Sequence, residues 1–102
     1  MSTTFRLTPQ AASDAEAIWA YLANAAGEAT ADRMLAKLFD GCTFIAAMPT
    51  AGHTRERDAP DDVRFWRVHP YQLVYRWQTR PVQIIAIVHG ARDMPRSLTG
   101  RV

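Results

Sequence analysis

Arginine and histidine side chains between residues 63 and 92 are the groups in this chain that could act on a phosphodiester. Arg64, Arg67, Arg76 and His89 all lie in this region. Cleavage of RNA without a metal requires a base for the 2′-hydroxyl, an acid for the leaving oxygen and cations that neutralise the phosphorane. A histidine and several arginines can supply these functions. The same residues also fit a hydrogen-bonded histidine beside charged side chains that contact a partner or water.

Other chemistries find little support in the sequence. The five glycines are scattered rather than clustered after a strand, which excludes a nucleotide-binding loop. His53, His69 and His89 stand far apart and have no cysteine pair beside them, so we expect no metal and no cofactor. No serine lies in a nucleophile elbow. Cys42, the single cysteine, is expected to be a small buried hydrophobic residue rather than a nucleophile.

The candidate residues lie on three runs that favour β-strands, at residues 63–69, 71–77 and 82–89. Each run is rich in aromatic or β-branched side chains, which fit a pleated sheet. Pro70 and Pro81 separate the runs, and a proline cannot donate a ladder hydrogen bond and favours a turn. We therefore predict an antiparallel meander, with a short edge strand at residues 5–7 before it.

The predicted sheet is apolar on both faces, which is unusual for an antiparallel meander. Alternation places one set of side chains on the same side: Tyr71, Leu73, Tyr75 and Trp77. Val74 points to the other side, where Ile85 and Ile87 or their counterparts in the last strand join it. A sheet with two apolar faces needs two covers.

Two amphipathic helices can supply one of these covers. Thr8 and Pro9 form a helix start signal, because threonine accepts hydrogen bonds from free amides and proline has no amide to satisfy. Apolar residues then recur at steps of four and three until Gly27 ends the helix, and a second helix spans about 28–48. The short link predicts antiparallel neighbours, which Gly41 and the many alanines would allow to approach closely.

The remaining segments are a polar connection at residues 50–62 and a tail after His89. The connection carries alternating charges, so we predict a solvated loop. The tail contains three arginines and few apolar residues, and we expect it on the surface. The second cover of the sheet must then come from elsewhere.

These elements predict a single domain over residues 1–102 of the α+β class. It consists of an N-terminal antiparallel helical hairpin packed on a small, mainly antiparallel β-sheet, in the order β-α-α-β-β-β. A content of 48% hydrophobic and 22% charged residues agrees with an ordinary globular domain. No run approaches the ~18 apolar residues of a membrane span, and the N-terminus lacks a signal segment, so we predict a cytoplasmic protein without membrane contact.

The charge is modest and unevenly distributed. The net charge is +2, which predicts little direct binding to nucleic acid. Residues 1–52 carry three basic against five acidic residues, a net of −2. Residues 53–102 carry nine basic against five acidic residues, a net of +4, and all nine are arginines, which suit bidentate contacts with carboxylates and phosphates.

A series of residues along nearly the whole chain has the order and spacing of a known family. The residues are Thr8, Pro9, Ala12, Asp14, Ile18, Trp19, Tyr21, Ala31, Pro49, Gly52, Arg64, Pro70, Tyr71, Tyr75, Arg76 and the run 87–93. Together they resemble the ParE branch of the RelE/ParE superfamily of bacterial type II toxins. The family fold is a helical hairpin packed on a small antiparallel sheet, which agrees with the pattern described above.

The resemblance implies a toxin that arrests growth and is held inactive by a cognate ParD-like antitoxin in a hetero-oligomer. The C-terminal segment of the antitoxin would wrap the toxin and supply the missing second cover. ParE-like toxins act on DNA gyrase by trapping it, without catalysis of their own, so gyrase is the implied target. The residues that we predict to bind the target or the antitoxin are Arg64, Trp66, Arg76, His89, Arg92 and Arg96.

The sequence leaves two alternatives open. RelE-like members are ribosome-dependent messenger endoribonucleases, and Arg64, Arg67, Arg76 and His89 would then be the catalytic set. The chain has only one lysine and an aromatic sheet centre, which does not favour this alternative. The other alternative is a non-toxic paralogue that retains only antitoxin binding.

Overall fold

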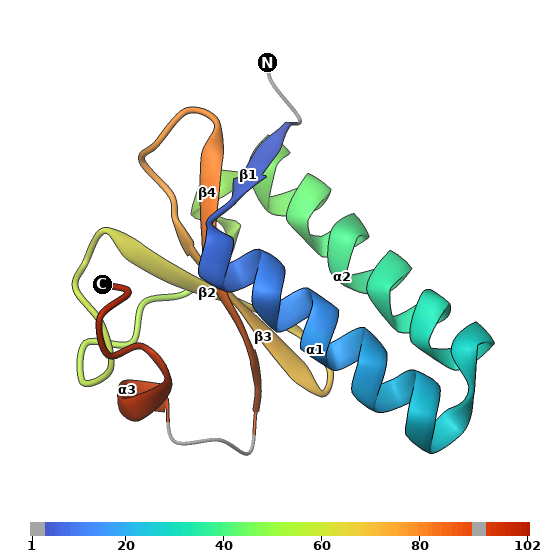
Figure 1. The fold of residues 1–102 in the computed structure, drawn as a ribbon. Coiled ribbons are helices and arrows are strands. Elements are labelled where there is room, and N and C mark those ends of the chain that lie inside the picture. Colours follow the sequence, from blue (N-terminus) through green and yellow to red (C-terminus); the bar gives the residue numbers. More distant parts are fainter. Residues whose placement is uncertain (1–3, 91–93) are drawn as a thin grey trace.

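The fold is described by a computed structural model that covers residues 4–90 and 94–102 (Figure 1). Within these ranges the elements are β1 Phe5–Leu7, α1 Pro9–Ala26, α2 Glu28–Ala47, the 3-10 helix η1 Pro49–Ala51, β2 Val63–Val68, β3 Tyr71–Arg76, β4 Val82–His89 and α3 Met94–Ser97. The predicted strands and the two long helices are confirmed to within one residue at their ends. The α+β class and the order β-α-α-β-β-β are confirmed as well.

The four strands form one mixed sheet in the order β1-β4-β3-β2. The pairs β2–β3 and β3–β4 are antiparallel, which confirms the meander, whereas β1 lies parallel to β4. The β1 pairing is short and ends where Leu7 meets Ile84. The two edges of the sheet are therefore β2 on one side and β1 with the remainder of β4 on the other.

The helical hairpin covers one side of the sheet, which we call the first face (Figure 1). The Thr8 hydroxyl accepts a hydrogen bond from the Ala11 amide at 3.1 Å, and Pro9 occupies the first turn, as the start signal predicts. Gly27 has a φ of +95° between α1 and α2, a conformation that glycine adopts without steric cost. The buried core of the first face is Ala11, Ala15, Leu38, Cys42, Ile45, Tyr71, Leu73, Tyr75, Val82, Ile84 and Ile87.

Gly41 faces the sheet rather than the other helix, so its predicted role in the contact between the helices is wrong. A Cβ atom at Gly41 would lie 2.8 Å from a methyl group of Val68 and 3.1 Å from one of Leu73. The glycine therefore lets α2 approach β2 and β3 closely. The α1–α2 contact depends instead on alanines such as Ala31, which is fully buried.

A β-bulge changes which side chains of β4 face the helices. Val74 is paired with Ala86 and Tyr75 with Ile84, so Ile85 is the additional residue on β4. Ile85 lies with Val74 on the second face, as predicted, but Ile87 lies on the first face. Strict alternation fails at this point because the bulge shifts the register by one residue.

The second face is covered by the C-terminal segment of the same chain (Figure 1). Met94 and Leu98 are 4% and 1% exposed and pack on Val63, Phe65, Val74, Ile85, Ala86 and Val88. The prediction that the tail is a surface segment and that the second cover comes from elsewhere is therefore wrong. Two apolar side chains four residues apart lie on the same side of a helical turn, so few apolar residues are sufficient.

Candidate functional site

The sheet has two ends that differ in how their polar side chains are used. We call the end that contains Tyr71 and His89 the turn end, because the β2–β3 turn lies there. We call the end that contains Val63, Arg76 and Val82 the loop end. The predicted site residues are distributed between these two ends.

Three cavities at the turn end share His89 as a lining residue. The first, about 350 Å³, lies between α1, β4 and the C-terminal segment. The second, about 570 Å³, is lined by α1 and by Pro70 and Tyr71. The third, about 340 Å³, is lined by the ends of β2 and β3 and by Gly90. The last residue of β4 is therefore surrounded by open concave surface, which is the usual setting of a binding site.

The His89 ring is exposed and packs against Tyr71 on the neighbouring strand. The two ring centroids are 5.5 Å apart and the planes meet at 81°, an edge-to-face contact. Burial, and to a smaller extent the nearby Tyr21, raise the pKa of Tyr71 above its ordinary value. Tyr21 on α1 is 68% exposed and lines the second cavity together with Leu22. An aromatic surface with a histidine at its border is thus available for contact.

Arg67 lies at the same end of the sheet, on the rim of the third cavity. Its guanidinium nitrogen Nη2 is 3.0 Å from Nδ1 of His69, and both side chains are exposed. Gln72, the cross-strand partner of Arg67, lines the same cavity. Of the four residues predicted as a nuclease set, the structure therefore brings Arg67 and His89 to the same end.

Arg64 lies near the loop end and holds the connection that precedes β2. Its Nη1 donates to the carbonyl oxygens of Gly52 at 2.9 Å and Thr50 at 3.4 Å, and its guanidinium lies 4.6 Å from the ring centroid of Trp77. The Tyr75 hydroxyl donates to the Pro49 carbonyl at 2.7 Å and accepts from the Gly52 amide at 2.9 Å. The prediction of a solvated loop is therefore wrong for its first residues, which are anchored to the sheet.

Arg76 and Trp66 also have structural contacts. Arg76 donates to the Gln83 side chain at 2.8 Å and to the Arg101 carbonyl at 2.9 Å. Because Arg76 is opposite Gln83, it lies six residues of β4 away from His89, roughly 20 Å along the strand. The Trp66 ring packs on Phe44 of α2 with centroids 4.9 Å apart. Neither residue lines any of the three cavities around His89.

The last two predicted contact residues lie in the C-terminal region. Arg96 is exposed on α3, and its neighbour Ser97 lines the first cavity. Arg92 lies outside the described residues. Cys42 is fully buried, and burial raises the pKa of its thiol to about 12, so the prediction of a buried hydrophobic cysteine is confirmed.

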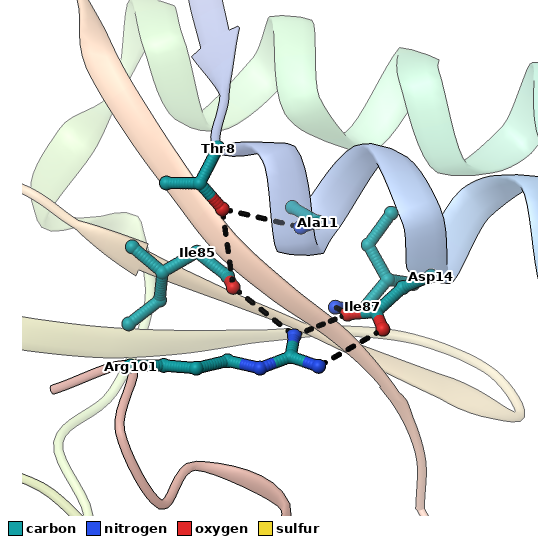
Figure 2. Close-up of polar contacts among 6 residues, drawn as sticks. All are labelled: Thr8, Ala11, Asp14, Ile85, Ile87 and Arg101. Carbon is teal, nitrogen blue, oxygen red and sulfur yellow. Dashed lines mark hydrogen bonds and ion pairs between the residues drawn. The ribbon is translucent and has the colours of Figure 1, made fainter.

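Arg101 is a lining residue of the first cavity that the sequence did not indicate. Its guanidinium contacts both carboxylate oxygens of Asp14, at 2.5 and 3.1 Å, and donates to the Ile85 carbonyl at 3.2 Å (Figure 2). Asp14 also accepts the Ile87 amide hydrogen at 3.0 Å. Asp14 and Arg101 are separated by 87 residues, and no local pattern predicts such a pair.

The described part of the chain also lacks two kinds of feature. Among residues 4–90 and 94–102, no helix is long and apolar enough to cross a membrane. Over the same ranges, no group of three or more histidine, cysteine, aspartate or glutamate side chains could hold a metal ion.

Comparisons with known proteins agree on one family. The model of a family described as the ParE toxin of the type II toxin-antitoxin system parDE matches residues 5–94. A solved structure described as the chromosomal ParDE toxin-antitoxin system from P. aeruginosa has the same fold, with a TM-score of 0.70 and 21% sequence identity. The match covers 86% of this chain and 98% of that one. No curated protein sequence matches the chain.

Proposed function

Because the chain belongs to the ParE toxin family of type II toxin-antitoxin systems, we propose that it arrests growth by binding DNA gyrase. We also propose that a ParD-like antitoxin neutralises it in a hetero-oligomeric complex. The solved structure with the same fold is described as a ParDE system, which supports an antitoxin as the partner. The action on gyrase is a property that the family resemblance implies.

The observation that carries a binding function is the separation of the predicted catalytic residues. Arg64 and Arg76 are bonded to backbone carbonyls away from the turn end, whereas Arg67 and His89 lie at that end. A metal-free nuclease needs its base, acid and cations around the same phosphate. Two of the four residues are engaged elsewhere, so the arrangement favours a toxin that binds its target and does not favour the RelE-like ribonuclease.

The proposed contact surface is the turn end with the adjacent part of the C-terminal region. From the predicted contact residues we keep His89, Arg92 and Arg96 for this surface, because Arg64, Trp66 and Arg76 line none of the three cavities around His89. His89 borders three cavities, and Arg96 is an exposed cation on α3. Exposed arginine and aromatic side chains are common at protein interfaces.

Supercoiling by purified gyrase tests the proposal. We expect the protein to inhibit supercoiling, and His89→Ala and Arg92→Glu to weaken the inhibition while leaving the fold intact. Arg57→Glu is the matched control, because it reverses a charge on an exposed loop residue that lines none of the cavities around His89. Normal supercoiling at saturating wild-type protein would contradict the gyrase target.

The two alternatives have separate tests. A RelE-like ribonuclease cuts translated messages at codon positions, so intact transcripts during growth arrest would exclude it. A non-toxic paralogue would leave growth unaffected when it is expressed without its antitoxin. Growth arrest under that condition would exclude the paralogue.

A further inference from the structure

We infer that Arg101 and Asp14 form a latch that holds residues 94–102, here called the strap, in the position that completes the cavity beside His89. The inference rests on the proposed function only in its last step, because it names two positioning residues for the proposed contact surface. Two observations support it: the geometry of the ion pair and the open edge of β4.

The ion pair joins two layers that lie on opposite faces of the sheet. Asp14 belongs to α1 on the first face, and Arg101 belongs to the strap, which covers the second face (Figure 1). The guanidinium donates through both terminal nitrogens to the carboxylate, a bidentate geometry that is stronger than a single contact (Figure 2). The contact therefore connects the strap to α1 around the edge of β4.

The latch lies where β4 lacks a neighbouring strand. β1 pairs with β4 only as far as Ile84, and the next backbone groups on this edge are the Ile85 carbonyl and the Ile87 amide. Asp14 accepts from the Ile87 amide at 3.0 Å, and Arg101 donates to the Ile85 carbonyl at 3.2 Å. Together with the Thr8 hydroxyl, which donates to the Ile85 carbonyl at 3.5 Å, the two side chains thus satisfy the groups that an adjacent strand would otherwise bond. Charged side chains on an exposed edge also oppose pairing with another chain.

Buried apolar side chains and a further hydrogen bond also hold the strap. Met94 and Leu98 are buried, and the Arg101 carbonyl accepts from Arg76 at 2.9 Å. The side chains of Arg101 and Asp14 are 22% and 20% exposed, so the ion pair is accessible to salt. Because a terminal segment can open locally without global unfolding, we expect loss of the ion pair to make opening of the strap more frequent.

The closed strap forms one wall of the first cavity. Ser97 and Arg101 line this cavity from the strap, and Asp14, Ile18 and His89 line it from α1 and β4. When the strap opens, this wall is lost and His89 borders open solvent on that side. The latch would therefore determine the shape of the surface that the target meets.

Hydrogen exchange on the full-length protein tests the latch. In Arg101→Gln we expect the Leu98 amide, which bonds to the Met94 carbonyl, to exchange about fivefold faster, whereas the Ile87 amide, which still donates to Asp14, should change little. The Gly52 amide, which is bonded to Tyr75, should be unchanged and reports that the variant is folded. Arg57→Gln removes the same charge from an exposed loop and should change none of the three rates.

Asp14→Asn tests the ion pair separately from the hydrogen bond that the Ile87 amide donates to residue 14. Asparagine keeps an oxygen that accepts from the Ile87 amide but loses the charge that attracts Arg101. We expect faster exchange at Leu98 and little change at Ile87. Unchanged Leu98 exchange in both variants would overturn the inference, because Met94 and Leu98 alone would then hold the strap.

Gyrase inhibition tests the effect on the contact surface. We expect Arg101→Gln to weaken inhibition several-fold, and Arg101→Lys, which keeps the charge but not the bidentate contact, to recover part of it. If Arg101→Gln speeds exchange at Leu98 but leaves gyrase inhibition unchanged, the cavity wall has no role in binding the target. If wild-type protein does not inhibit gyrase, the proposed function fails, and the exchange measurements still decide whether the latch exists.

Discussion

At the loop end of the sheet, arginine and tyrosine side chains are bonded to backbone groups, whereas at the turn end the same residue types border open cavities. Arg64 donates to the Gly52 and Thr50 carbonyls, and Tyr75 bridges Pro49 and Gly52. Arg67 and His89 are exposed and line concave surface. One end therefore stabilises the connection between the helices and the sheet, and the other offers a surface for contact.

The difference between the two ends shows that residue type alone does not determine the role of an arginine on a strand. A guanidinium that satisfies backbone carbonyls inside a loop contributes to stability, and its replacement leaves those carbonyls without a partner. A guanidinium on an exposed strand end contributes little to stability and is available for a ligand or a protein. The neighbouring backbone decides between the two roles.

The largest expected effect is that of an added methyl group at the loop end. A Cβ atom at Gly52 would lie 2.4 Å from the Tyr75 hydroxyl and 2.8 Å from the Phe65 carbonyl oxygen, so Gly52→Ala should lower the free energy of unfolding by about 3 kcal/mol. At the turn end, a Cβ at Gly90 would lie 3.2 Å from the Pro70 carbonyl oxygen, and Gly90→Ala should cost under about 1 kcal/mol.

Denaturant unfolding of the two glycine variants measures this difference. Equal losses of stability would mean that the turn end is packed as tightly as the loop end. In that case the comparison between an anchored end and an open end would have to be abandoned.

A smaller effect is expected for matched arginine variants. Arg64→Met removes two hydrogen bonds to carbonyls and the contact with the Trp77 ring, and we expect a loss of about 2 kcal/mol in the free energy of unfolding. Arg67→Met affects an exposed side chain and should change stability by no more than about 0.5 kcal/mol. Thermal or denaturant unfolding of both variants provides the measurement. A larger loss for Arg67 than for Arg64 would reverse the assignment of roles.

The smallest effect concerns alkaline pH. Burial is the main reason that the pKa of Tyr75 is raised, and hydrogen bonding to Gly52 and the charge of Arg64 oppose the shift. A raised pKa means that the unfolded phenol, which ionises near pH ~10, loses its proton before the folded one. The associated stability is therefore fully present below about pH 10 and is lost as the pH rises through the folded pKa.

Unfolding measured between pH 8 and 11 should show this loss, and Tyr75→Phe should remove part of it. The pKa of Tyr71 at the turn end is also raised, so Tyr71→Phe should also reduce the loss of unfolding free energy with rising pH. If neither variant alters the dependence of the free energy of unfolding on pH, other groups control stability at high pH.

Local patterns in the sequence were sufficient for the elements and the family. Thr8, Pro9 and Gly27 marked the first helix, and the β-prone runs marked the strands, because capping, turn formation and side-chain alternation act over a few residues. The sequence also placed His89 among the site candidates, and the structure puts it at the border of three cavities.

The sequence could not separate structural arginines from exposed ones, since the partners of Arg64 and Arg76 are backbone carbonyls on distant segments. It also missed the strap, whose burial depends on two apolar side chains that meet the second face only after the chain has folded. Residue types and spacing thus determined the helices, the strands and the family. Only the tertiary structure decided which arginines are bonded to backbone carbonyls and which are exposed, because hydrogen bonds and burial depend on contacts between distant segments.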